Sequence, residues 1–131
     1  MKSVTQLSVF LKNEPGVLAA ICDTLARQKI NIHGMSVVDA VDHAVLRLVV
    51  NNPKNAMLIL EERGMLVMDN EILQLSIPNK PGTLGKVATK LARAKINIDY
   101  AYAAAGPGTA RTTVYMKVSD TKKAVRALRG K

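Results

Sequence analysis

The chain has 131 residues, of which 48% are hydrophobic and 22% are charged, a composition typical of a globular protein with its own core. Aromatic residues make up only 3%, so aliphatic side chains must fill that core and little surface is left for stacking nucleic-acid bases. No stretch is long and apolar enough for a signal peptide or a membrane span. We therefore expect a cytoplasmic protein with no membrane partner.

The formal net charge of +9 is distributed unevenly. Residues 1–65 hold seven basic and six acidic side chains, whereas residues 66–131 hold twelve and four. The surplus has two interpretations: basic side chains that only solvate helices, or a nucleic-acid or other acidic partner. Solvation is favoured and nucleic acid is not expected, because no Arg/Gly-rich or aromatic-interleaved segment accompanies the charge.

Two segments of the chain occur twice. Residues 13–18, Asn-Glu-Pro-Gly-Val-Leu, return about 66 positions later as residues 79–84, Asn-Lys-Pro-Gly-Thr-Leu. Residues 29–32, Lys-Ile-Asn-Ile, return in the same way as residues 95–98. The repetition predicts a tandem pair of one small module, with residues 1–70 as the first unit and residues 71–131 as the second.

Each copy opens with an apolar alternation that predicts a strand, from Leu7 to Leu11 in the first copy and from Leu73 to Ile77 in the second. A Pro-Gly pair ends the strand, because proline cannot donate to a ladder and glycine adopts backbone angles that other residues avoid. Apolar residues at helical spacing then predict a helix directly after each glycine.

The rest of each copy repeats the same order of elements. We expect second strands over residues 30–38 and 96–103, third strands over 44–50 and 112–118, and second helices that open at Pro53 and Asp120. Residues 65–68 supply a short fourth strand in the first copy, whereas the second copy stops before one. Residues 66–68 or a partner chain would then have to cover the first strand of the second copy.

This order predicts an α+β fold of two ferredoxin-like βαββαβ units side by side, each an antiparallel sheet with its helices on one face. Catalysis is not expected, since neither His33 nor His43 recurs in the other copy and the acidic residues form no recurring pair. Cys22 is the only cysteine, and no phosphate-binding loop or dinucleotide glycine pattern occurs. We therefore expect no metal and no cofactor.

Four asparagines do recur. Asn13 and Asn79 precede the Pro-Gly turns, while Asn31 and Asn97 lie between isoleucines at the start of the second strands. They could simply cap turns and occupy the outer face of the sheet. They could equally bind an amino acid, because asparagine offers both a donor and an acceptor and the nearby helix N-terminus favours a carboxylate. The residues alone leave both interpretations open.

The doubled pattern, Asn-x-Pro-Gly-x-Leu after a strand, then a helix, then hydrophobic-Asn-hydrophobic, resembles the ACT domain, a small ligand-sensing module of amino-acid metabolism. ACT units often join their sheets edge to edge, which implies a homodimer, and bind effector amino acids at the seam. Carried over by position, the resemblance implies that Asn13 works with Asn97 and Asn79 with Asn31. The implied ligand-binding set is Asn13, Gly16, Val17, Leu18, Asn31, Ile32, Asn79, Gly82, Thr83, Leu84, Asn97 and Ile98.

The resemblance implies a non-enzymatic sensor that binds a free amino acid and regulates a metabolic enzyme. The two sites are expected to be unequal, because Lys80 replaces Glu14 and Thr83 replaces Val17. One alternative is a scaffold module that keeps the fold without a ligand. Another is a nucleic-acid binder that uses the basic second half. The sequence does not identify the amino acid.

Overall fold

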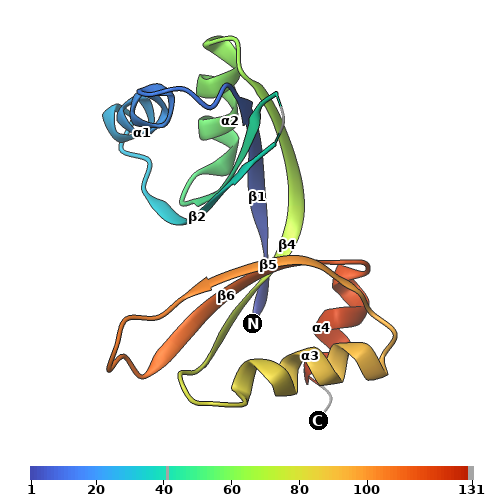
Figure 1. Ribbon diagram of the computed structural model, residues 1–131. Helices are drawn as coiled ribbons and strands as arrows, with labels where there is room; N and C mark the ends of the chain where they lie inside the picture. Colours follow the sequence, from blue (N-terminus) through green and yellow to red (C-terminus); the bar gives the residue numbers. More distant parts are fainter. Residues whose placement is uncertain (41, 130–131) are drawn as a thin grey trace. The chain divides into compact units, whose positions relative to one another are not determined.

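The computed structural model describes residues 1–40 and 42–129. In chain order the elements are β1 (Lys2–Leu11), α1 (Val17–Arg27), β2 (Ile32–Asp39), β3 (Ala44–Val50), α2 (Pro53–Glu62), β4 (Leu66–Pro78), α3 (Thr83–Arg93), β5 (Ile98–Ala104), β6 (Arg111–Val118) and α4 (Thr121–Arg129) (Figure 1). Hydrogen bonds link the strands in the order β2-β3-β1-β4-β6-β5. The α+β class and the repeated element order that the sequence predicts are confirmed.

The chain forms two compact units. The N-terminal unit is Thr5–Asn70, and the C-terminal unit combines Met1–Val4 with Glu71–Lys131. The long strands β1 and β4 therefore contribute residues to both units.

The core of the N-terminal unit forms where β1 pairs with β3. Leu7 lies opposite Leu48, and Val9 lies opposite Leu46, so these four buried side chains share one face of the sheet. Helices α1 and α2 cover that face with buried residues that belong to the same cluster, namely Ile21, Leu25, Ala56 and Leu60. Each fully buried leucine or isoleucine contributes about 1.5–3 kcal/mol to folding.

The C-terminal unit repeats this packing. Leu73 of β4 lies opposite Met116 of β6, and Leu75 lies opposite Val114. Helices α3 and α4 complete the cluster through the buried residues Leu91 and Ala124. Both helices therefore lie on one face of the strands of this unit, as Figure 1 shows for α3 and α4.

The second strands begin two residues later than the sequence predicts, at Ile32 and Ile98. The two isoleucines that precede them belong instead to the end of a helix, since Ile30 N donates to Leu25 O and Ile96 N to Leu91 O, both at 2.9 Å. Lys29 and Lys95 adopt left-handed φ angles of 58° and 60° and reverse the chain there. Apolar spacing could not separate this buried helix terminus from the start of a strand.

The strand that links the two copies also differs from the prediction. The sequence predicts a short strand over residues 65–68 and a separate strand from Leu73 to Ile77, but β4 runs without interruption over Leu66–Pro78. Asp69 and Asn70, which resemble turn residues in the sequence, lie within this strand. Local residue type misled the prediction because pairing with neighbouring strands holds both residues extended.

Residues at the beginning of the chain contribute to the C-terminal unit. No strand follows α4 among the described residues, but Met1–Val4 belongs to the C-terminal unit and β1 is a hydrogen-bonded neighbour of β4. The Ser3 hydroxyl donates to the Glu71 carboxylate at 2.7 Å. The sequence predicted that residues 66–68 or a partner chain would pair with the first strand of the second copy. It did not predict a contribution from Met1–Val4.

Removal of residues 1–4 should therefore expose the backbone of β4 in the C-terminal unit. We expect faster amide hydrogen exchange over residues 71–77 and little change in β3 of the N-terminal unit. A full-length Lys2→Ala/Ser3→Ala variant is the control, because it keeps the backbone pairing. Equal exchange rates in the truncated and full-length chains would contradict the assignment.

Tyr115 of β6 lies opposite Tyr102 of β5, and the two rings stack with centroids 5.3 Å apart. Tyr115 is buried, with 6% of its surface exposed. Burial disfavours the charged phenolate and raises the pKa of Tyr115 above the usual value of 10.0.

A raised folded-state pKa makes the neutral phenol stabilising. That contribution is fully present below the unfolded pKa and is lost as the pH rises through the higher folded pKa. The free energy of unfolding should thus decrease above about pH 10, and less steeply in Tyr115→Phe than in a Tyr100→Phe control. Denaturant unfolding at several alkaline pH values measures this, and identical slopes in the two variants would refute it.

Candidate functional site

The turn between β1 and α1 opens its helix without a side-chain cap. Gly16, the N-cap residue, has a φ of 91°, a left-handed conformation that favours glycine. The turn is closed by backbone bonds from Glu14 N to Lys12 O at 3.0 Å and from Val17 N to Glu14 O at 3.3 Å. Because no side chain caps α1, its N-terminal turn can offer N–H groups to an external acceptor.

Asn13 ties this turn to the end of β2. Its side-chain Nδ2 donates to Asp39 Oδ1 at 3.0 Å, which leaves the amide oxygen outside that bond. A depression of about 500 Å³ lies here, lined by Lys12, Asn13, Glu14, Asp39, Ala40, Asp42 and His43. The lining thus brings carboxylates, a lysine and an amide together, groups that bind both ends of a zwitterion.

The equivalent turn between β4 and α3 has the same backbone conformation but different side-chain hydrogen bonds. Gly82 repeats the left-handed N-cap with a φ of 88°. The Asn79 side chain donates to the backbone oxygen of Thr109 at 3.0 Å, where its counterpart donates to a carboxylate. The Thr83 hydroxyl lies 2.7 Å from Pro78 O and 3.0 Å from Lys80 O, an interaction that valine cannot make in the first copy. The two turns are therefore electrostatically unequal.

We call Asn31 and Asn97, which directly precede the second strands, the strand asparagines; each is held by reciprocal bonds to the residue that follows the third strand of its copy. Asn31 N donates to Asn51 Oδ1 at 3.0 Å, and Asn51 N donates back to Asn31 O at 3.2 Å. In the second copy, Asn97 N donates to Ser119 Oγ at 3.0 Å, and Ser119 N returns a bond of 2.9 Å to Asn97 O. These bonds fix the backbone from which each asparagine side chain extends.

The two strand asparagines differ in their side-chain bonds. Asn97 Nδ2 donates to Asp99 Oδ1 at 2.9 Å. In the first copy His33 stands in place of that aspartate, and within the described part of the chain no side-chain hydrogen bond of Asn31 is found. The side chain of Asn31 is thus the less constrained of the two.

Sequence reasoning missed Asp39, Asn51 and Ser119 as parts of these arrangements. The signal for the last two was present, since Asn51 and Ser119 each directly precede the residue that opens a second helix, Asn52 or Asp120. No repeat marks Asp39, because the aligned residue of the second copy is Ala105.

The structure separates the two kinds of asparagine within each copy. Asn13 lies with Gly16, Val17 and Leu18 before and at the start of α1, whereas Asn31 and Ile32 follow its end. The eleven residues of α1 span about 16 Å at 1.5 Å per residue. Helix α3 has the same length and separates Asn79 from Asn97 in the same way. The two asparagines of one copy thus lie at opposite ends of a helix, too far apart for a single amino acid to contact both.

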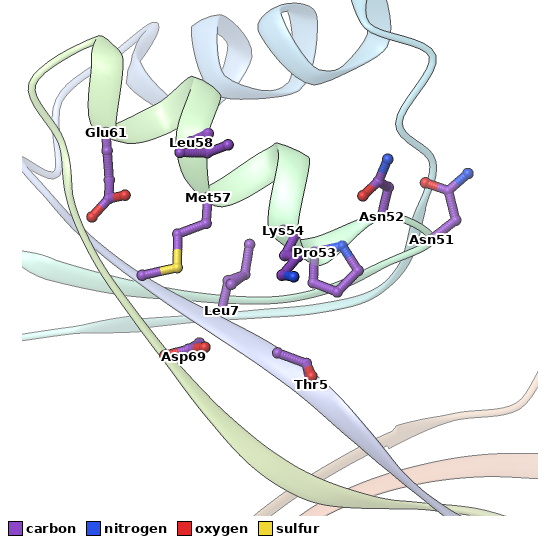
Figure 2. Close-up of a pocket in the computed structure, with 10 residues that line it drawn as sticks. All are labelled: Thr5, Leu7, Asn51, Asn52, Pro53, Lys54, Met57, Leu58, Glu61 and Asp69. Carbon is purple, nitrogen blue, oxygen red and sulfur yellow. The ribbon is translucent and has the colours of Figure 1, made fainter.

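Figure 2 shows a larger depression of the N-terminal unit, about 860 Å³, between α2 and the strands β1 and β4. Met57, Leu58 and Leu7 supply apolar surface, and the exposed charges of Lys54, Glu61 and Asp69 surround it. None of the residues predicted to bind ligand lines this depression. It was not anticipated from sequence, because its lining comes from three separate segments of the chain with no shared motif.

Residues 2–127 match the family model of the ACT domain pair. The chain belongs to the ACT domain pair family. The resemblance that the doubled asparagine motif indicated is thereby confirmed, together with the two ferredoxin-like units. A pair of ACT domains explains why both segments of the sequence occur twice. No curated protein sequence matches the chain.

Solved structures with the same fold include a protein of Bacteroides thetaiotaomicron, 29% identical with a TM-score of 0.91, covering 97% of this chain and 87% of that one. The regulatory subunit of aspartate kinase from Thermus thermophilus, in its ligand-free form, is 18% identical with a TM-score of 0.73, covering 98% and 96%. The aspartate kinase of Clostridium acetobutylicum is 18% identical with a TM-score of 0.63, covering 97% of this ACT chain and 32% of the kinase.

No helix among the described residues is long and apolar enough to cross a membrane. No group of three or more His, Cys, Asp or Glu side chains there is placed to hold a metal ion.

The Thr83 hydroxyl gives the second turn a bond that the first turn lacks. Thr83→Val should lower the free energy of unfolding by about 0.5–1.5 kcal/mol, the usual net worth of such a hydrogen bond. Val17→Thr is the matched substitution in the first copy. Chemical denaturation measures both, and a Thr83→Val variant as stable as the parent would show that the hydroxyl does not brace the turn.

Proposed function

We propose that this ACT domain pair is a non-catalytic regulatory protein that binds a free amino acid and controls a partner through that binding. The observation that carries the proposal is the recurrence, in both copies, of an asparagine before a glycine-opened helix that no side chain caps. The repeated turn suits a ligand that carries a carboxylate.

The chemistry of the turn supports a zwitterionic ligand. The helix N-terminus carries about half a positive charge and attracts the carboxylate, while the asparagine oxygen can accept from the ammonium. Asp39 and Asp42 border the first turn and add acceptors for a positive group. In the second turn Lys80 replaces Glu14, which strengthens attraction of the carboxylate and weakens that of the ammonium.

Each ligand would need two half-sites from different copies, because α1 and α3 hold the asparagines of one copy apart. We propose the pairs Asn13 with Asn97 and Asn79 with Asn31, formed between copies of one chain or between two chains of a homodimer. The remaining proposed ligand residues are those around these asparagines, namely Gly16, Val17, Leu18, Ile32, Gly82, Thr83, Leu84 and Ile98.

A ligand shared between copies can regulate a partner. It stabilises whichever arrangement of the copies brings its half-sites together, and the shift is limited by the difference in its affinity for the alternatives. Coupling of this kind is typically about 1–3 kcal/mol, which changes a partner's activity several-fold or more. The regulatory subunit of aspartate kinase shares this fold, so we propose a metabolic enzyme as the regulated partner.

Isothermal titration of the common amino acids into the protein tests the proposal. For an amino acid that binds, Asn13→Ala and Asn97→Ala should each weaken one site by about 1–3 kcal/mol, because polar ligand atoms lose their partners. Asn55→Ala, an exposed asparagine of α2, is the control and should leave affinity unchanged. Unchanged affinity at every site in both variants would refute the pairing, and no binding by any amino acid would favour a ligand-free scaffold.

A further inference from the structure

The two helices of the C-terminal unit carry basic side chains and no acidic ones. We call these exposed residues the basic helix layer: Lys86, Lys90, Arg93, Lys122, Lys123, Arg126 and Arg129. None of them belongs to the two salt bridges found in the described part of the chain, Arg27 with Asp23 and Lys117 with Asp99. Their positive charge is therefore presented to the surroundings.

The N-terminal unit shows that the fold does not require most of this charge, although Arg27 and Lys54 there align with Arg93 and Lys122. At the aligned positions of α1 it has Ala20 for Lys86, Asp23 for Thr89 and Thr24 for Lys90. At the aligned positions of α2 it has Asn55 for Lys123, Leu58 for Arg126 and Glu61 for Arg129. The same fold is built there with a helix layer of mixed charge. Solvation alone thus does not explain why only the second copy is basic.

Two depressions of the C-terminal unit share Lys86 and Lys90. One, of about 460 Å³, is also lined by Gly82, Gly85, Thr89 and Arg93. The other, of about 250 Å³, is also lined by Met1, Leu75, Ile77, Val87 and Leu128. The two lysines therefore border one depression that also holds the cationic side chain of Arg93 and a second one lined mainly by aliphatic side chains.

The occupant of this surface must supply negative and aliphatic groups together. Phosphates of a nucleic acid would meet the lysines, but a nucleic acid has no aliphatic side chain for the apolar depression, and neither helix carries an aromatic residue for base stacking. A protein segment with both carboxylates and leucine-like side chains satisfies both depressions.

We propose that α3 and α4 form a docking surface for an acidic, amphipathic segment of a partner protein. Carboxylates of the segment pair with Lys86, Lys90 and Arg93, and one of its aliphatic side chains enters the depression over Leu75 and Leu128. Apart from its chain neighbours and the backbone of its own helix, nothing lies within 4 Å of the place where a Cβ of Gly85 would be, so the surface there is open to an approaching chain. This inference goes beyond the amino-acid sensor, since none of the four asparagines lines either depression and Gly82 is the one proposed ligand residue that does.

Fluorescence anisotropy with synthetic probes tests the surface in the absence of any amino acid. The first probe is a labelled peptide with glutamate and leucine in a helical repeat, and the second replaces each leucine by serine at the same charge. We expect the leucine peptide to bind more tightly, and both affinities to fall as salt screens the charges. Equal affinity of the two peptides would overturn the role of the apolar depression.

Variants with reversed charges test whether the peptide binds at Lys86 and Lys90. Lys86→Glu/Lys90→Glu should weaken the leucine peptide by about tenfold or more, as expected for charges at the centre of a docking surface. Lys54→Glu/Arg63→Glu makes the same change in net charge on the N-terminal unit and should alter affinity by less than about twofold. Lys86→Gln/Lys90→Gln, a milder change, should give an intermediate loss. Equal losses in both reversal variants would show an effect of net charge alone and overturn the proposal.

Two further probes test nucleic acid and lipid membranes as alternative partners. Labelled duplex DNA and vesicles of mixed neutral and anionic lipid are titrated into the same protein at the same salt concentration. Under the proposal both bind more weakly than the leucine peptide, because neither fills the apolar depression with an aliphatic side chain of matching size. Tighter binding of DNA or vesicles, lost in the Lys86→Glu/Lys90→Glu variant, would reassign the surface and refute a protein partner.

Discussion

Pairing of backbone groups along β1 and β4 is the constraint on which this structure depends. An ACT-type unit places its first strand between two neighbours, and an unpaired neighbouring position costs stability and invites aggregation. The chain meets this need with two long strands, of ten and thirteen residues, that serve both units. The beginning of the chain thus contributes strand residues to the C-terminal unit, in which no strand follows α4 among the described residues.

Most of the fold could be predicted from the sequence because periodicity and turn chemistry act locally. The Pro-Gly turns, the helices beginning at Val17 and Thr83, and Pro53 at the start of α2 all lie where these signals place them. The continuous strand β4 could not be predicted, because long-range pairing holds Asp69 and Asn70 extended against their local tendency to turn. A short window of sequence carries no signal of strand pairing between residues that are far apart along the chain.

The candidate site shows the same division between local and distant information. Repetition alone identified the asparagines and the glycines, and the left-handed backbone at Gly16 and Gly82 explains why glycine stands there. Asp39 reaches Asn13 from the far end of β2, so its role appears only in three dimensions. The two turns share the same backbone conformation but differ in charge, since Glu14 of the first turn corresponds to Lys80 of the second.

Nuclear magnetic resonance spectra of the isotopically labelled protein, recorded with and without the common amino acids, test the central claim most directly. The account predicts that an amino acid shifts the backbone signals of residues 13–18 together with those of Asn97 and Ile98, or of residues 79–84 together with Asn31 and Ile32. Residues 54–61, which line the depression beside α2, should remain unchanged. Shifts confined to that depression, or no shift with any amino acid, would contradict amino-acid binding at the repeated asparagines.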